Sequence, residues 1–112
     1  PAPRGETSET IRQRVIKARD IQTERFRNIP GIHCNAQMTA SQLETFATPD
    51  AEGARRLAFA MKSLNLSARA YGRILKVART IADLDASKTI LPQHIAEAIG
   101  YRNLDRSDWA ER

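Results

Sequence analysis

Four cationic side chains recur along one segment of this sequence, and their spacing suits the binding of an anion. The segment runs from Leu64 to Leu84, and no acidic residue occurs between Ser67 and Ala82. Its cationic residues are Arg69, Arg73, Lys76 and Arg79. On a helical wheel they fall opposite an apolar arc of roughly 160°. Such a face can attract an anion such as a nucleotide phosphate.

Arg69 has the position best suited to phosphate. Ser67 is expected to cap the helix, so Arg69 lies in the first turn, where backbone N–H groups are free and the helix dipole is positive. A guanidinium adds a planar, permanently charged fork that matches phosphate oxygens. Arg73 follows one turn later on the same face. From spacing alone, an exposed arginine without a partner is an equally good interpretation.

The sequence predicts no catalytic set. Neither a G-x-x-x-x-G-K-S/T phosphate loop nor a G-x-G-x-x-G motif occurs. His33 and Cys34 are adjacent, but a structural zinc site needs four ligands, and His94 is the only other histidine or cysteine. The two histidines, one in a connector and one in the last helix, also give no basis for a Ser-His-Asp catalytic triad. We therefore expect no catalytic residue, no metal site and no enzymatic activity from this chain alone.

The composition indicates one helical globular domain. The chain has 112 residues, 41% hydrophobic and 28% charged, with only five glycines and five prolines, which favours a single core and helix over strand. No apolar run reaches the ~18 residues of a membrane span, and the first residues lack the apolar stretch of a signal peptide. The single cysteine, Cys34, excludes an internal disulfide and fits a cytoplasmic location.

Start signals and periodicity predict an all-α bundle of four helices plus one short helix. The first helix is expected from Glu9 to Phe26, capped by Thr7 or Ser8. Residues 41–44 match a capping box that would open the short helix. Residues 48–49, a threonine followed by proline, would open the next helix. Its apolar stripe would be Ala54, Leu57, Ala58, Met61 and Leu64.

The central helix follows after Asn65, which can adopt the left-handed conformation that ends a helix. Its inward residues are expected to pack against Leu57 and Met61, and they are Tyr71, Leu75, Ala78 and Ile81. The wheel places Arg79 and Asp83 on the opposite, polar side. Pro92 is expected to open the last helix, which would end near Gly100.

The central residues also resemble a known family. The matching segments are Leu66-Ser67-Ala68-Arg69-Ala70-Tyr71, Arg73-Ile74-Leu75 and Val77-Ala78-Arg79-Thr80-Ile81-Ala82-Asp83-Leu84. They resemble the C-terminal helical domain of magnesium-chelatase-like AAA+ ATPases, and within that family the bacterial competence-protein (ComM) branch. A weaker likeness includes residues 11–22, 35–38 and 90–102, so that the resemblance covers nearly the whole chain.

The resemblance implies that residues 1–112 form one helical lid domain of a larger ATPase, with residues 1–6 and 103–112 as flexible ends. In this family a lid arginine called sensor 2 reaches the terminal phosphates of ATP. Arg69 matches it by position, and Arg73 is the second candidate. ATP with Mg²⁺ would bind to the full-length protein and not to the fragment alone. The expected partners are the AAA+ core domain and neighbouring subunits of a homo-oligomeric ring, with DNA a candidate partner of the whole protein and no membrane involved.

Two other functions stay open at the level of sequence. The net charge of +5 has its excess in residues 1–30 and 67–112, which suits an independent nucleic-acid-binding module that uses the first and fourth helices. These basic faces are also explained as ordinary solvated helix surfaces. A helical adaptor for a protein partner is the third hypothesis. A phosphate loop elsewhere in the full gene would favour the ATPase lid.

Overall fold

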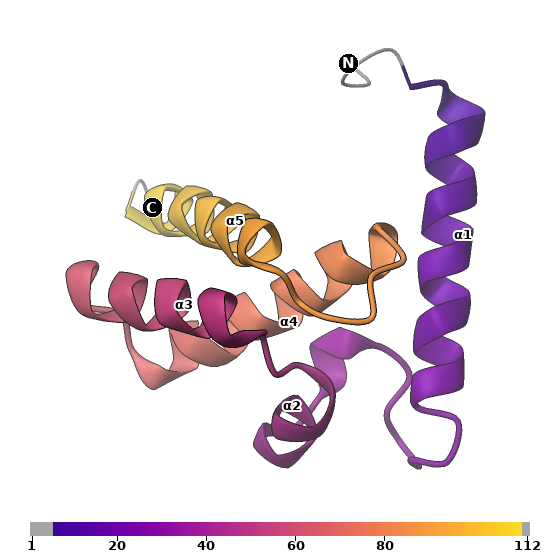
Figure 1. Ribbon diagram of the computed structural model, residues 1–112, viewed down its shortest axis with the longest axis horizontal. Helices are drawn as coiled ribbons and strands as arrows, with labels where there is room; N and C mark the ends of the chain where they lie inside the picture. Colours follow the sequence, from indigo (N-terminus) through magenta and orange to yellow (C-terminus); the bar gives the residue numbers. More distant parts are fainter. Residues whose placement is uncertain (1–5, 111–112) are drawn as a thin grey trace.

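The computed structural model describes the backbone of residues 6–110 and the side chains of residues 6–101. Its helices (Figure 1) are α1 (Ser8–Arg25), a 3-10 turn (Asn35–Gln37), α2 (Ala40–Phe46), α3 (Ala51–Ser63), α4 (Ala68–Leu84) and α5 (Pro92–Ala110). Within this part of the chain there is no β-strand, and Pro49 and Ile90 form an isolated bridge. The predicted all-α fold with one short helix is therefore confirmed.

Several helix boundaries follow the predicted signals. The Thr7 hydroxyl accepts a hydrogen bond from Thr10 N at the start of α1. The Ser67 hydroxyl does the same for Ala70 N at the start of α4. Asn65, between α3 and α4, has a φ of 52°, the left-handed conformation that asparagine tolerates better than most residues.

The predicted starts of α2 and α3 are wrong. The capping box of α2 joins Thr39 and Gln42, so that the helix begins two residues ahead of the expected box. At α3 the Asp50 carboxylate accepts from Gly53 N, since aspartate is a stronger N-cap than the expected Thr48. Pro49 instead forms the bridge to Ile90.

The core is built around α4, which contacts α1, α2, α5 and the 3-10 turn, while α3 packs on α5 (Figure 1). Leu57 and the predicted α4 residues Leu75, Ala78 and Ile81 are buried, and Met61 packs against them. Tyr71 was expected in this core, yet 43% of it is exposed. At the start of α4, Tyr71 lines an open cavity formed with α2 and the segment that follows it.

The buried face of α3 is rotated from the predicted stripe. Gly53, Leu57 and Ala60 are buried, whereas Ala54 and Ala58 are exposed. A Cβ on Gly53 would lie 2.9 Å from the Asp50 Oδ1 atom, so this turn tolerates only glycine without rearrangement. A glycine that packs closely carries no hydrophobic signal, which is why the periodicity indicated the wrong face.

Helix α1 buries little of its surface, and helix α5 departs from expectation. The upper part of α1 in Figure 1 stands clear of the other helices, and Ala18 is its only buried residue, with Val15 exposed. Helix α5 continues past the predicted end at Gly100 to Ala110. The prediction of flexible ends falls on residues 1–5 and 111–112, and on side chains of residues 102–110, that lie outside the described part of the chain.

Candidate functional site

The first two turns of α4 present Arg69 and Arg73 to solvent. Ser67 positions them, because its hydroxyl accepts from Ala70 N and its carbonyl accepts from Tyr71 N. Within the described part of the chain, the Arg69 guanidinium makes no hydrogen bond or ion pair. Its charge is therefore available to an anion.

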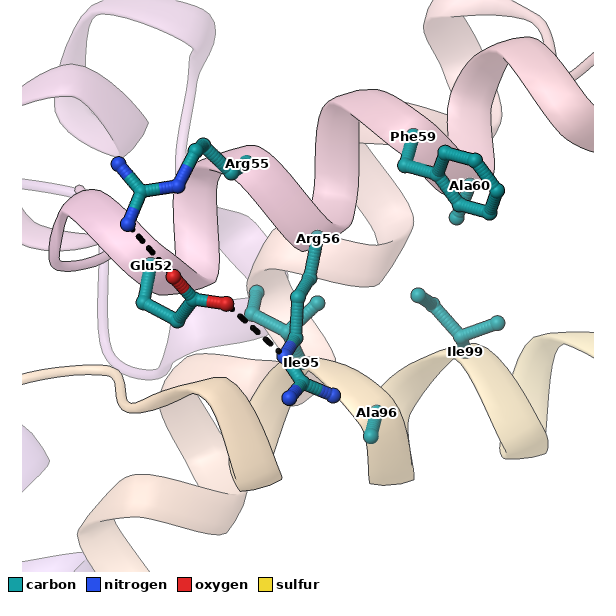
Figure 2. A pocket seen from close by; sticks show the side chains of 8 residues that line it. All are labelled: Glu52, Arg55, Arg56, Phe59, Ala60, Ile95, Ala96 and Ile99. Carbon is teal, nitrogen blue, oxygen red and sulfur yellow. Dashed lines mark hydrogen bonds and ion pairs between the residues drawn. The ribbon is translucent and has the colours of Figure 1, made fainter.

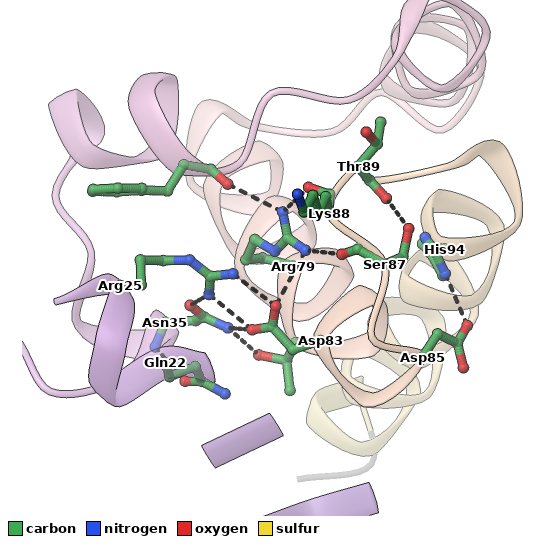
Figure 3. Close-up of polar contacts among 12 residues, drawn as sticks. Gln22, Arg25, Asn35, Arg79, Asp83, Asp85, Ser87, Lys88, Thr89 and His94 are labelled. Atoms are coloured by element: carbon green, nitrogen blue, oxygen red, sulfur yellow. Dashed lines mark hydrogen bonds and ion pairs between the residues drawn. The ribbon is translucent and has the colours of Figure 1, made fainter. Parts of the chain in front are cut away.

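The other end of α4 contradicts the prediction that Arg79 is exposed. Only 4% of Arg79 is accessible. Its Nη1 atom donates to the carbonyl oxygen of Lys88 at 3.0 Å, and Nη2 donates to that of Ser87 at 2.6 Å (Figure 3). Nη1 also lies 3.4 Å from the Phe46 carbonyl oxygen. Arg79 thus satisfies carbonyl groups at the end of α2 and in the loop before α5, and its role is structural.

Asp83 is likewise buried, although the wheel placed it on the polar side. It is 1% exposed and receives both terminal nitrogens of Arg25, at 2.8 and 2.7 Å. Asn35 Nδ2 donates to it at 2.9 Å, and Arg79 Nη2 lies 3.1 Å away (Figure 3). The four side chains, Arg25, Asn35, Arg79 and Asp83, form a buried polar cluster that joins α1, the 3-10 turn and α4.

The surroundings of Arg79 in this cluster lower its pKa. Burial is the largest influence and lowers the pKa of Arg79, the carboxylate of Asp83 raises it, and the neighbouring cation of Arg25 lowers it again. Among the described residues, the buried Arg79 Nε atom has no hydrogen-bond acceptor. One carboxylate therefore faces two guanidinium groups in a poorly solvated place.

Of the four cationic candidates on α4, burial leaves two at the surface. Lys76 is half-buried and Arg79 is buried, whereas Arg69 and Arg73 are exposed. The burial of Arg79 and Asp83 could not be predicted from a helical wheel, because a wheel shows only where a residue lies on its own helix. The one available signal was Asp83 itself, the first acid after the long basic stretch and four residues from Arg79, the spacing of an intrahelical ion pair.

Comparison with known proteins identifies this helical arrangement. Residues 5–102 match the family described as magnesium chelatase, subunit ChlI C-terminal. The chain belongs to this family. The α4 segment that carries Arg69 lies within the matched residues.

The chain is similar to proteins of two bacteria. It is 45% identical over 103 residues to the competence protein ComM of Haemophilus influenzae, covering 92% of this chain and 19% of that protein. It is 42% identical over 102 residues to the uncharacterised protein YifB of Escherichia coli, covering 91% of this chain and 19% of that protein. The domain thus spans about a fifth of the length of these relatives.

The residues considered for a metal site do not come together in the ChlI-type domain. His33 and Cys34 are exposed, whereas His94 is buried, with its Nδ1 atom accepting from Leu91 N and its Nε2 atom 2.9 Å from Asp85 Oδ2. Among the described residues, no three histidine, cysteine, aspartate or glutamate side chains are grouped as metal ligands would be. His94 therefore serves to fix the start of α5.

An open apolar groove lies between α3 and α5 of the domain (Figure 2). Phe59, which is 74% exposed, lines it together with Ile99. Its charged residues pair with each other, since Glu52 contacts both Arg55 and Arg56, and Arg55 is the main cause of the lowered pKa of Glu52.

Over the described residues, no helix is both long and apolar enough to cross a membrane.

Proposed function

We propose that this domain is the lid of an AAA+ ATPase and that Arg69 is its sensor-2 arginine. The observation that carries the proposal is the state of Arg69: an exposed guanidinium in the first turn of α4, with no partner in the described part of the chain. The magnesium-chelatase family and the resemblance of the Leu66–Tyr71 segment to AAA+ lids support it. Arg73, one turn further on the same face, is the second candidate.

The residues present suit one contact to a phosphate and do not form a complete nucleotide site. No acid lies between Ser67 and Ala82 to compete for the Arg69 guanidinium, and the N-terminal end of α4 adds a positive dipole. The sequence holds no phosphate loop, so a core domain outside this sequence would bind ATP with Mg²⁺. Bound ATP supplies the phosphoanhydride bond that is cleaved, and Arg69 supplies a charge that stabilises its terminal phosphates.

The packing of α4 explains how such a contact would move the domain. α4 contacts α1, α2 and α5, and the Arg25–Asp83 pair joins α1 to α4 by two short hydrogen bonds. A force on Arg69 would therefore shift these helices together as a rigid body. Loss of the terminal phosphate would remove that force, and the domain would rotate back.

We further propose that the full-length protein forms a homo-oligomeric ring in the cytoplasm that acts on DNA. The support is the resemblance to the ComM branch and the 45% identity to a competence protein. The net charge of +5 is compatible with a polyanionic substrate. In a ring, Arg69 would reach ATP in its own subunit or in a neighbouring one.

The test is ATP turnover by the full-length protein. Arg69→Ala should lower turnover by at least about tenfold, because it removes a charge-assisted contact to the phosphates. Arg69→Lys should restore little, since an ammonium lacks the fork of a guanidinium. Lys62→Ala is the control, because Lys62 is an exposed cation on α3 that also makes no hydrogen bond or ion pair in the described residues. Wild-type turnover in Arg69→Ala would refute the sensor-2 assignment.

A nucleic-acid-binding module is the second candidate function, and the shape of α1 favours it. This helix projects from the body (Figure 1) and carries the exposed cations Arg12, Arg14, Lys17 and Arg19. Arg19→Ala should then weaken the binding of a DNA oligonucleotide by the domain itself and reduce the salt dependence of binding. An unchanged affinity would remove α1 from consideration.

A further inference from the structure

A cavity of about 540 Å³ opens beside the buried polar cluster, between α1, α2 and the loop that follows α4. Its cationic lining residues come from three separate segments and are Lys17, Arg25, Arg79 and Lys88. Ile21 and Phe46 provide apolar walls. Residues distant in the sequence thus bring four positive charges to one concave place.

The positive charge of this cavity is only partly neutralised. Asp83 is the carboxylate that the buried guanidinium groups share, and it is 1% exposed and already bonded to Arg25 and Asn35. Lys17 and Lys88 are exposed and form no ion pair or side-chain hydrogen bond in the part of the chain that the structure describes. Three positive charges are therefore left without a counter-charge.

An unmet hydrogen-bond donor occurs in the same place. Arg79 lines the cavity, and its buried Nε atom lacks an acceptor among the described residues, although nearly all buried polar groups in folded proteins have a partner. Burial is the main cause of the lowered pKa of Arg79, and the nearby cation of Arg25 lowers it further, against the raising effect of Asp83. An anion entering the cavity would relieve this imbalance.

We infer that this cavity binds a phosphate group, carried either by a small phosphorylated molecule or by a nucleic-acid backbone. A phosphate dianion matches the two unpaired lysines better than a carboxylate, which carries one charge, and mobile ammonium groups are common phosphate ligands. The guanidinium groups behind them strengthen the attraction through a poorly solvated medium. The inference does not depend on the sensor-2 proposal, because Arg69 does not line this cavity.

The experiment is a titration of the 112-residue chain, followed by ¹H–¹⁵N NMR, with inorganic phosphate and separately with a short single-stranded DNA oligonucleotide. Saturable shifts are expected at Lys17, Phe46, Ala86 and Ser87. In the double variant Lys17→Ala/Lys88→Ala the affinity should fall about tenfold or more, as the loss of charged contacts predicts. Both lysines are exposed, so this variant is expected to fold. Saturation by phosphate would indicate a small ligand, and saturation by the oligonucleotide alone would indicate a nucleic-acid backbone.

The matched control is Lys62→Ala/Arg56→Ala, which removes the same charge from exposed residues of α3 that do not line the cavity. It should bind phosphate as the wild type does, because neither residue lines the cavity. The proposal is overturned if the two double variants lose affinity equally, if the shifts do not saturate, or if an acidic peptide binds the cavity more tightly than phosphate does.

Discussion

The two ends of α4 carry the same kind of residue and use it in opposite ways. Arg69, at the first turn, is exposed and makes no side-chain contact in the described residues. Arg79, near the last turn, is 4% exposed and bonded to two carbonyl groups of the loop before α5, the carbonyl group of Phe46 at the end of α2, and a carboxylate. Both arginines fall on the polar side of the helical wheel. The surroundings from other segments, and not the helix itself, decide which arginine is free to act on a ligand.

The difference has a physical cause in the contacts of α4. Its first turns pack against the short α2 and follow directly on the end of α3, whereas its last turns lie close to α1 and the loop before α5 (Figure 1). A polar residue buried between these segments must find partners, because an unpaired buried charge is very costly. Asp83, Arg25 and Asn35 supply them.

The largest effect is expected at the enclosed end. Asp83→Ala should lower the free energy of unfolding of the domain by ~3–5 kcal/mol, because it leaves the buried guanidinium of Arg79 and the partly buried one of Arg25 without their carboxylate. Urea denaturation followed by circular dichroism measures this change. Asp20→Ala, an exposed acid on α1, should cost less than about 0.5 kcal/mol. A loss below about 1 kcal/mol in Asp83→Ala would mean that the cluster contributes little to the fold.

A slightly smaller effect is expected between the two ends. Leu75 is 4% exposed and part of the main core, so that Leu75→Ala should cost about 2–5 kcal/mol through lost burial and a cavity. The same urea experiment tests it. A change below about 0.5 kcal/mol would show that this face of α4 is not packed as the structure has it.

How far the sequence predicted this molecule depends on whether the signal is local. Ser67 and Asn65 were predicted correctly because a cap or a left-handed residue acts on its own neighbours. Leu75 was predicted because apolar periodicity suffices for burial at mid-helix. Arg79 and Asp83 were not, since their partners Arg25, Asn35 and Ser87 come from other segments. Arg69 is exposed, as predicted. Its role as the sensor-2 arginine stays a prediction.

A gain of stability is expected at the exposed end. In α4 a Cβ on Gly72 would meet only Leu43 Cδ1, at an ordinary 3.7 Å. Gly72→Ala should therefore raise the free energy of unfolding by about 0.5–1 kcal/mol through helix propensity. Gly53→Ala, where the Cβ would meet Asp50 Oδ1 at 2.9 Å, should act in the opposite sense. Destabilisation by Gly72→Ala would show that the first turns of α4 are more crowded than their contacts indicate.

The smallest effect on folding is expected at Arg69, and it is the most informative one. Since Arg69 is exposed and its guanidinium makes no hydrogen bond or ion pair with the described residues, Arg69→Ala should change the stability of the domain by no more than roughly 0.5 kcal/mol, as surface substitutions usually do. The same substitution should reduce ATP turnover in the full-length protein. Arg79→Ala would lower both together, because it disrupts the fold, so it cannot serve as a control for catalysis. A folded Arg69→Ala protein with impaired turnover would therefore separate a ligand contact from a structural one, whereas destabilisation comparable to that of Asp83→Ala would make Arg69 part of the scaffold.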